Sequence, residues 1–188
     1  MIHNCVKRRK PLNLRIEGAV AHVTVGNRTF QMDAEDLPLL EGWTLAITSR
    51  GYVQLQGTST QRPRQFHYLS RIVLGAPAGT EVDHISGDTL DNRKANLRVC
   101  TRGENVSNCR RHKGNNLYKG SYYGKRQTGE RKWLAQLKHA GTVYYLGWFL
   151  TPEEAAVAYN AKALELFGKF ARINVLGAPG QTVSATEL

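Results

Sequence analysis

The sequence predicts an α+β protein built from several small antiparallel sheets and a few helices. Short runs of alternating apolar and polar residues recur along the chain, separated by turn residues such as Gly26-Asn27 and Arg50-Gly51. Strong helix-start signals follow at Thr101 and Thr151, each with a glutamate three residues later. No internal repeat is present in the sequence, which excludes the solenoid classes.

The composition indicates a polyanionic partner. The 188 residues include 26 Lys and Arg against 15 Asp and Glu, which gives a formal net charge of +11 and a sequence pI near 9.8. A basic surface gains affinity for nucleic acid by releasing counterions from the phosphates. A merely soluble basic protein, or one that touches acidic lipid, would carry the same charge.

We expect a soluble, cytoplasmic chain. The longest uncharged apolar run, Val143 to Leu150, is far shorter than the roughly 20 residues that cross a bilayer. The basic residues of the opening MIHNCVKRRK are not followed by an apolar segment, so we expect no signal peptide. Cys5, Cys100 and Cys109 form no CxxC pair and do not suggest a disulfide framework.

Residues 1–60 are expected to form a small strand-rich support region. Two hairpins are predicted there, joining residues 23–25 to 28–30 and residues 44–49 to 52–56. Asp33 can cap a helical turn that runs to Gly42. The residues that recur at helical spacing after this region are Phe66, Leu69 and Val73. Gly75 is suited to end that helix.

Residues 80–109 read TEVDHISGDTLDNRKANLRVCTRGENVSNC and combine two strands with one capped helix. The first strand ends at Asp83-His84, and Asn105 lies early in the helix, with Asn108 further along the same face. Two antiparallel strands and a helix can bring Asp83, His84 and Asn105 together. Because neighbouring strand residues point to opposite faces, the backbone has to twist where the strand ends.

These residue types suit phosphodiester hydrolysis. A divalent cation must neutralise charge that develops on the phosphate and the leaving oxygen, and hard cations such as Mg²⁺ take oxygen ligands. Asp83 and the amide oxygen of Asn105 supply oxygens, and a neutral His84 imidazole can take a proton from the attacking water. An Asp-His dipeptide alone means little, so the prediction depends on the whole string.

The string VDHISGDTLDNRKANLRVCTRGEN resembles the HNH (ββα-metal) nuclease motif, in the subgroup typical of phage and intron-encoded homing endonucleases. The resemblance implies that His84 is the general base and that Asp83 and Asn105 bind the metal. It also implies that the Asn96 amide holds the loop so that His84 faces the phosphate. The family tends to carry a histidine in an upstream helix, which here is His67.

The string departs from the family pattern in places that concern the metal. Asn105 stands where many HNH enzymes have histidine, and Ser86 stands where Asp or Asn is usual. The residues that could be imagined as ligands of a structural zinc are Cys100, Cys109 and His112, but a closed zinc site wants four ligands. We therefore expect a divalent metal, Mg²⁺ or Mn²⁺, and no structural zinc.

Residues 110–116, RRHKGNN, have the composition of a basic linker between two domains. Arg110, Arg111 and Lys113 in this linker can also contact a phosphate backbone.

Residues 117–175 predict a three-stranded sheet packed on one helix. Residues 132–138 alternate cleanly, a turn at Ala140-Gly141 leads to a partner strand over 142–149, and residues 118–123 supply a third strand. The run Thr151-Pro152-Glu153-Glu154 then starts a helix that Gly168 ends.

This segment resembles the plant ethylene-response-factor (apetala-two) DNA-binding domain, widespread also in phage homing endonucleases, through YKG, KW-A, LG-F, EEAA-AY and ARIN. The resemblance implies that the sheet face opposite the helix enters a DNA major groove. Plant members read bases with arginines and tryptophan, whereas Tyr122, Val143 and Tyr145 stand at the matching positions, so the plant target sequence does not carry over. A unit that binds protein or RNA has the same general pattern. The residues expected to contact DNA are Lys119, Tyr122, Lys125, Arg126, Gln136, Lys138 and Tyr145.

Together, the two resemblances predict a metal-dependent endonuclease that nicks or cleaves duplex DNA. The nuclease domain is expected over 61–109, the DNA-binding domain over 117–175 and a flexible tail over 176–188. Two alternatives stay open: a DNA-binding regulator whose nuclease head has decayed, and an RNA-binding accessory protein. No coiled coil or dimer face is evident, which favours a monomer with no protein or membrane partner. A phage-encoded chain would act in the host cytoplasm.

Overall fold

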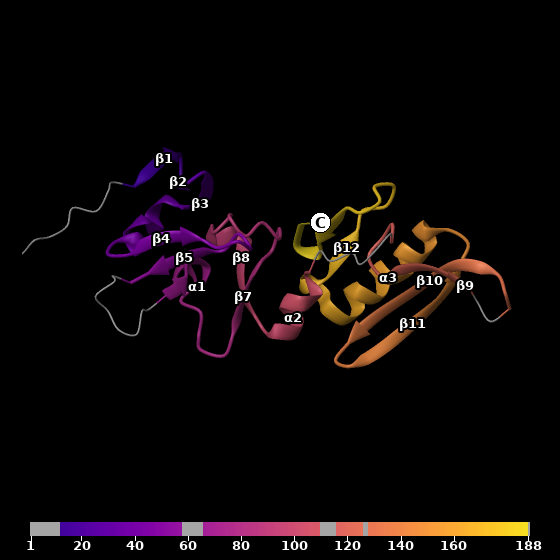
Figure 1. The fold of residues 1–188 in the computed structure, drawn as a ribbon. Helices are drawn as coiled ribbons and strands as arrows, with labels where there is room; N and C mark the ends of the chain where they lie inside the picture. Colours follow the sequence, from indigo (N-terminus) through magenta and orange to yellow (C-terminus); the bar gives the residue numbers. More distant parts are fainter. Residues whose placement is uncertain (1–11, 58–65, 110–115, 126–127, 188) are drawn as a thin grey trace, which may run out of the picture. The chain divides into compact units, whose positions relative to one another are not determined.

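The computed structural model describes residues 12–57, 66–109, 116–125 and 128–187, and it confirms the predicted α+β class (Figure 1). The chain divides into two compact units. The N-terminal unit comprises residues 1–75 and the segment 89–95, and the C-terminal unit comprises residues 76–88 and 96–188. The middle of the HNH-like string therefore belongs to a different unit from its two ends.

The N-terminal unit contains two antiparallel sheets, ordered β1-β2-β3 and β4-β5-β6. Its elements are β1 (Asn13–Glu17), β2 (Val20–Val25), β3 (Arg28–Asp33), the 3₁₀ helix η1 (Ala34–Leu40), β4 (Thr44–Ile47), β5 (Val53–Gln56), β6 (Phe66–Tyr68) and α1 (Leu69–Val73). Both predicted hairpins are confirmed, since Val25 pairs with Arg28 and Ile47 pairs with Val53 across the two turns. The most deeply buried apolar side chains of this unit include Val23, Phe30, Met32, Leu55 and Leu69.

Two details predicted for this unit are wrong. Residues 66–68 form strand β6 on β5 and do not begin a helix, so α1 starts only at Leu69. The apolar spacing fits a strand followed by one helical turn equally well, and pairing with β5 decides between them. The Asp33 side chain does not cap η1, because its Oδ2 accepts a hydrogen bond from the backbone N–H of Lys94 at 2.8 Å.

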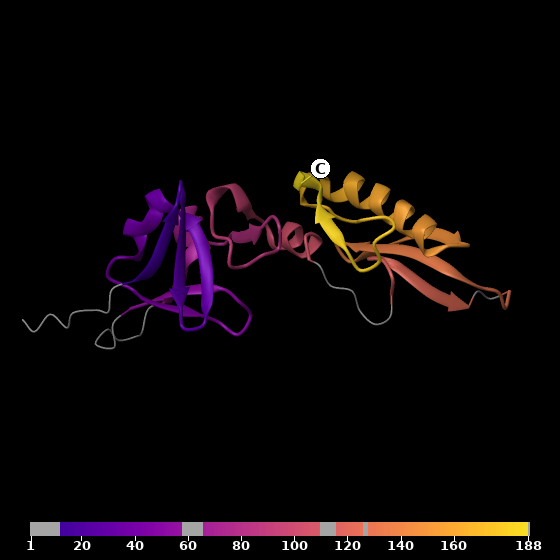
Figure 2. The same cartoon turned by 90° about the horizontal axis from the view of Figure 1, so that it is seen from above.

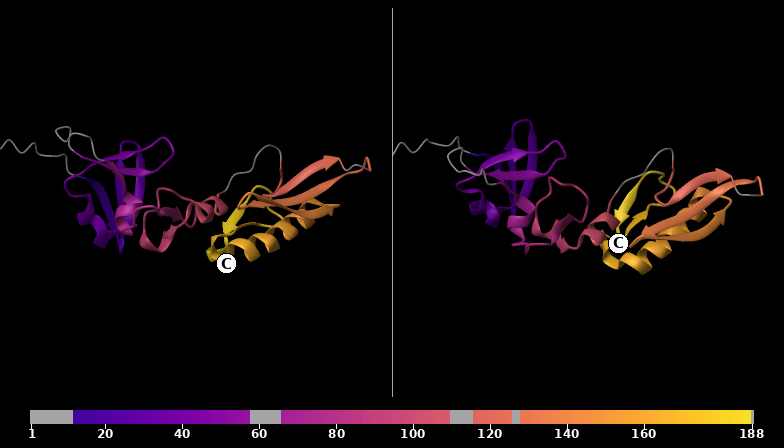
Figure 3. Two further views of the ribbon diagram at one scale, coloured as in Figure 1. Left: turned by 90° about the horizontal axis from the view of Figure 1, so that it is seen from below. Right: turned by 60° about the horizontal axis from the view of Figure 1, so that its bottom comes forward.

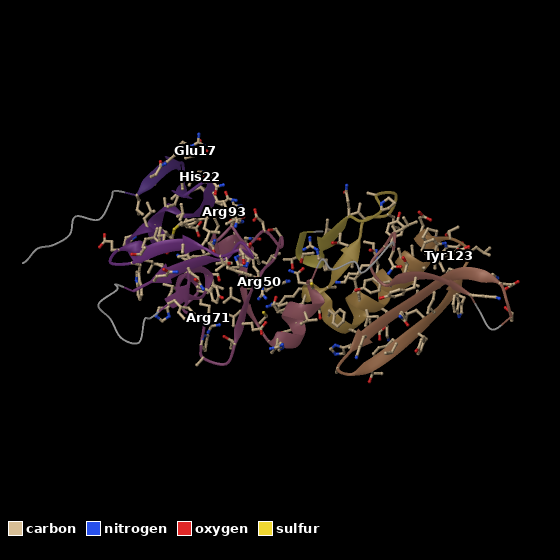
Figure 4. All side chains as sticks on the ribbon, in the orientation of Figure 1. Glu17, His22, Arg50, Arg71, Arg93 and Tyr123 are labelled. Carbon is tan, nitrogen blue, oxygen red and sulfur yellow. The ribbon has the colours of Figure 1, made fainter. Side chains whose placement is uncertain are left out.

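The segment 89–95 pairs with strand β3 of the N-terminal unit. The backbone N–H of Gln31 donates to the carbonyl of Leu90 at 2.9 Å, and the carbonyl of Gln31 accepts from the N–H of Asn92 at 2.8 Å. Within the segment, Nη2 of Arg93 lies 2.6 Å from Oδ2 of the buried Asp91 (Arg93 is labelled in Figure 4). These bonds explain why this part of the string belongs to the N-terminal unit.

The C-terminal unit contains three antiparallel sheets, ordered β7-β8, β11-β10-β9 and β12-β13. Its elements are β7 (Glu81–His84), β8 (Leu97–Cys100), α2 (Arg102–Ser107), β9 (Ser121–Lys125), β10 (Arg131–His139), β11 (Thr142–Phe149), α3 (Pro152–Phe167), η3 (Gly168–Phe170), β12 (Arg172–Asn174), β13 (Thr182–Ser184) and η4 (Ala185–Glu187). A further 3₁₀ turn, η2 (Lys94–Asn96), leads into β8.

Helix α3 packs on one face of the sheet β9–β11 (Figure 2), as the sequence predicts. Thr151 and Glu154 form the predicted capping box at its start, and Gly168 ends it at a φ of 50°. The buried core between helix, sheet and β12 contains Leu137, Tyr159, Ala163, Ala171 and Ile173. Small alanines on the helix let it lie close to the strands.

A β-bulge interrupts the pairing of β10 with β11. Ala135 pairs with Gly147 and Gln136 pairs with Tyr145, which leaves Leu146 as the extra residue. The bulge keeps Gln136 and Tyr145 on the sheet face opposite α3, and two further views of the ribbon show that face (Figure 3).

The expected flexible tail, residues 176–188, includes a paired strand. Strand β13 pairs with β12 through Arg172 opposite Ser184 and Asn174 opposite Thr182. The Arg172 guanidinium adds bonds to Thr182, with Nε 2.9 Å from the hydroxyl and Nη2 3.0 Å from the carbonyl. Those contacts stabilise residues 182–184 on the C-terminal unit.

Within the part of the chain that the structure describes, no helix is long and apolar enough to cross a membrane.

Candidate active site

Strands β7 and β8 and helix α2 form the framework of the site. The predicted antiparallel pair is confirmed, with Asp83 opposite Arg98 and His84 opposite Leu97. The predicted capping box at the start of α2 is also confirmed, because the Thr101 hydroxyl accepts from the N–H of Glu104 and the Glu104 carboxylate accepts from the N–H of Thr101. This cap fixes where the asparagines of α2 lie relative to β7.

Asp83 is buried, at 5% exposed, and two side chains bind its carboxylate. Nε of Arg98 donates to Oδ2 at 2.8 Å, and Nη2 of Arg98 lies 2.7 Å from the same oxygen. Nδ2 of Asn108 lies 3.0 Å from both carboxylate oxygens. A buried carboxylate needs such partners, because removing a charge from water is costly unless it is paired and hydrogen-bonded.

Asn108, at the C-terminal end of α2, joins the helix to the end of β7. In addition to Asp83, its Nδ2 lies 3.1 Å from the carbonyl of His84 and 3.2 Å from that of Ile85. The sequence places Asn108 on the same helix face as Asn105, and the structure shows that Asn108 is the one that contacts Asp83.

Asn105 binds a different carboxylate. Its Nδ2 donates to Oε2 of Glu81 at 2.6 Å. Glu81 and Asp83 are two residues apart on β7, so both side chains point to the face that α2 covers. The structure thus brings both predicted ligands, Asp83 and Asn105, to the same strand–helix pair, without a direct hydrogen bond between them.

His84 ends β7 and is buried, at 5% exposed. A tight turn follows it, in which the N–H of Gly87 donates to the carbonyl of His84 at 2.8 Å and Gly87 has a φ of 76°. Asn96 binds this turn, since its Oδ1 accepts from the N–H of Ser86 at 2.9 Å and its carbonyl accepts from the N–H of Ile85 at 2.8 Å. These contacts are of the kind that the resemblance to HNH nucleases implies for Asn96.

The oxygen atoms of this cluster suit a hard divalent cation. Within the described residues, Oδ1 of Asp83 accepts from Asn108 alone, and Oδ1 of Asn105 accepts no hydrogen bond. Carboxylate and amide oxygens are the ligands that Mg²⁺ and Mn²⁺ prefer. No three His, Cys, Asp or Glu side chains gather as a metal site in the described ranges.

His67 lies in the N-terminal unit, on strand β6 rather than in the upstream helix that the resemblance implies. Its ring packs edge-on against Trp43, with 5.3 Å between ring centroids. A part for His67 in the chemistry stays a prediction.

Four of the residues expected to contact DNA lie on the sheet face opposite α3. They are Tyr122, Gln136, Lys138 and Tyr145, which follow from the pairings of Leu134 with Tyr122, Gln136 with Tyr145, and Lys138 with Val143. Tyr145 is 73% exposed, and Lys138 is also exposed. Lys125 lies on the same side of β9 as Tyr123, which is labelled in Figure 4. The ring centroids of Tyr123 and Trp133 lie 5.1 Å apart. Arg110, Arg111, Lys113 and Arg126 lie outside the described residues.

Lys119 lies in a different environment from the exposed lysines. Its Nζ donates to the carbonyl of Ser107 in α2 at 2.9 Å and lies 5.9 Å from the ring centroid of Tyr159. Burial lowers the pKa of its ammonium to about 8. Lys119 and the exposed Lys138 line one open pocket together with Arg102 and His139, so this surface is basic.

The sequence alone did not single out Arg98, Glu81 and Arg172 as members of the site. Arg98 could have been found from the strand pairing, which sets it opposite Asp83, and Glu81 from its position two residues before Asp83. Arg172 lies 64 residues from Asn108 in the sequence, and no local pattern marks their contact.

Comparison with known proteins agrees with this geometry. The family model described as HNH endonuclease matches residues 72–107, which contain β7, β8 and α2. An uncharacterized HNH endonuclease of Acanthamoeba polyphaga mimivirus is 29% identical over 150 residues, covering 79% of this chain and 76% of that protein. No solved structure gives a significant match. The chain therefore carries an HNH endonuclease domain, a domain of hydrolases that act on phosphodiester bonds in nucleic acid.

Proposed function

We propose that the chain is a metal-dependent endonuclease of the homing type that nicks or cuts duplex DNA and leaves 5′-phosphate and 3′-hydroxyl ends. The observation that carries the proposal is the cluster of Asp83, Asn105 and Asn108 on β7 and α2, directly beside His84. This cluster lies within the residues that match the HNH family model.

His84 is the general base in this proposal. A ring nitrogen of His84 takes the proton from the water that attacks the phosphorus, opposite the departing 3′ oxygen. Asn96 supports this role, because its side-chain Oδ1 accepts from the N–H of Ser86 and its backbone carbonyl accepts from the N–H of Ile85, which fixes the turn that follows His84.

Asp83 and Asn105 would hold the divalent metal, Mg²⁺ or Mn²⁺, through Oδ1 of each side chain. When bound, such an ion supplies positive charge to the phosphate and the leaving oxygen. Arg98 and Asn108 keep the Asp83 carboxylate in place from one side, which leaves Oδ1 the less engaged oxygen.

The sheet β9–β11 is the proposed DNA-binding surface. Two features support it: the face opposite α3 carries exposed side chains at Lys138 and Tyr145, and it presents amide, ammonium and phenol groups at Gln136, Lys138 and Tyr145. Such groups can bond base edges and phosphates in a major groove. The charge of +11 on the whole chain supports the same partner.

Conversion of supercoiled plasmid and phage genomic DNA, measured with Mg²⁺, Mn²⁺ or EDTA, tests the proposal. We expect nicking or linearisation with the metals, none with EDTA, and loss of cleavage in His84→Ala at nearly unchanged DNA affinity. A His84→Ala protein that still nicks DNA at the wild-type rate would contradict the assigned base. Salt-sensitive duplex binding with no cleavage of any DNA would instead favour a decayed, regulatory nuclease.

A further inference from the structure

Arg172 is a fully buried arginine that joins the C-terminal strands to the nuclease motif. It is 1% exposed and lies on β12, outside the residues that match the HNH family model. On one side it binds Thr182 of β13. On the other side Nη1 lies 3.3 Å from Oδ1 of Asn108 and 3.4 Å from the carbonyl of Ile85, and Nη2 lies 3.3 Å from the carbonyl of Ser86.

The contact with Asn108 determines which way the Asn108 amide points. A guanidinium carries donors only, so Oδ1 of Asn108 must face Arg172. The donor group Nδ2 then faces Asp83 and the two carbonyls that follow it. In the flipped amide, an NH₂ group would meet the guanidinium and an oxygen would meet the Asp83 carboxylate, so both ends would be repulsive.

Arg172 also binds the turn that follows His84. The carbonyls of Ile85 and Ser86 accept from its two terminal nitrogens, while Asn96 binds the N–H groups of the same two residues. The N–H groups of residues 85 and 86 are thus bound by Asn96 of the motif itself, and their carbonyls are bound by Arg172 of β12. A planar, forked donor can do this and an ammonium cannot.

We propose that Arg172 is a positioning residue of the nuclease site, which acts through Asn108 and the 85–86 backbone on Asp83 and His84. The inference rests on the proposed function, and it adds that the HNH motif is incomplete without the C-terminal region. Cleavage then requires β12 in place even when DNA binding is intact.

The test compares Arg172→Lys and Arg172→Ala with Thr182→Val in the full chain. Thr182→Val removes an acceptor of the same guanidinium on the β13 side and leaves the acceptors on the nuclease side. We expect single-turnover cleavage by both Arg172 variants to fall by about tenfold or more, as for residues that orient metal ligands. Their duplex affinity should stay within about twofold, and Thr182→Val should cleave within about twofold of wild type.

Chemical rescue separates positioning from loss of fold. Methylguanidinium should restore cleavage by Arg172→Ala, and methylammonium at the same concentration should not, because only the former supplies a planar fork. Arg172 variants that cleave like wild type would overturn the proposal. A loss of cleavage that only follows the unfolded fraction and is not rescued would overturn it as well.

A second readout does not depend on nuclease activity. The side-chain amide resonances of Asn108, assigned with Asn108→Ala, should shift in Arg172→Lys and stay in place in Thr182→Val. Unchanged Asn108 resonances in a folded Arg172→Lys protein would contradict the inference even if the chain cleaves DNA. A shift in a chain that cleaves no DNA would support the Arg172–Asn108 linkage and count against the proposed function alone.

Discussion

Arg98 and Asp83 face each other across β7 and β8, and the guanidinium Nε lies 2.8 Å from the carboxylate Oδ2. The same guanidinium donates through Nη1 to the carbonyl of Lys169 at 2.6 Å, and its carbon lies 4.3 Å from the ring centroid of Phe170. Arg98 therefore connects the predicted metal ligand to η3, at the end of α3. Planar stacking and a forked donor set make arginine hard to replace there.

Arg98→Ala should destabilise the C-terminal unit strongly. The side chains of Arg98 and Asp83 are 10% and 6% exposed, so the variant leaves a buried carboxylate without its charged partner. Breaking a buried pair in this way costs about 3–5 kcal/mol. Urea denaturation measures the change. Arg15→Ala is the matched control, because Arg15 pairs with Glu17 at the surface and such pairs contribute about 1 kcal/mol or less. Equal losses in the two variants would contradict this account.

Thr101→Ala should weaken both stability and cleavage. Loss of an N-cap side chain costs about 1 kcal/mol, and α2 carries Asn105 and Asn108. Thr151→Ala removes the equivalent cap from α3, so it should cost a similar free energy of unfolding and leave the cleavage rate of bound DNA nearly unchanged. Thermal denaturation and single-turnover cleavage of both variants test this. Equal cleavage by the two would show that the start of α2 does not position the site.

Local sequence signals predicted the elements of the site well. The end of β7 at Asp83-His84, the strand β8 and the capping box of α2 all depend on residues close together in the chain. The sequence could not decide which asparagine meets Asp83. Asn105 and Asn108 are three residues apart on one helix face, and only the packing of α2 on β7 selects Asn108.

Long-range contacts explain the parts that local patterns did not predict. Gln31 pairs with the segment 89–95 and so assigns the middle of the HNH-like string to the N-terminal unit. Arg172 reaches the nuclease motif from β12. Neither contact produces a periodic pattern in the sequence. Each depends on a single residue in a strand, and the sequence around that residue does not indicate which distant residue it meets.

Lys119 should give the stability of the C-terminal unit a distinctive pH dependence. Burial lowers its pKa to about 8 from the usual value of 10.5. The unfolded chain therefore holds this proton more tightly than the folded one between these two values, so the free energy of unfolding should rise with pH across that range. Below pH 8 the folded state carries the whole penalty of a buried charge. The expected change is on the order of 2–3 kcal/mol.

Urea denaturation of wild type and Lys119→Met at pH 7, 8, 9 and 10 isolates this contribution. The difference between the two proteins should move in favour of wild type as the pH rises. Lys138→Met, which removes one positive charge from the exposed sheet face, corrects for the general effect of charge. A wild-type advantage that does not change with pH would mean that the Lys119 ammonium keeps its proton in the folded state.

Gly120→Ala should destabilise the C-terminal unit through a direct clash with Tyr159. Gly120 has a φ of 78°, and a Cβ at this position would overlap the Tyr159 ring, with Cγ only 2.7 Å away. Tyr159 is 4% exposed and belongs to the core with Leu137 and Ala163, so its ring has little room to move. Overpacking and backbone strain together predict a loss of about 2–4 kcal/mol. Gly177→Ala is the control, because Gly177 has a φ of 77° with nothing within 4 Å of an added Cβ, and it should cost only about 1 kcal/mol of strain. If urea denaturation gave the same loss for both, backbone conformation alone would explain the glycine at 120, and the close approach to Tyr159 would have no energetic consequence.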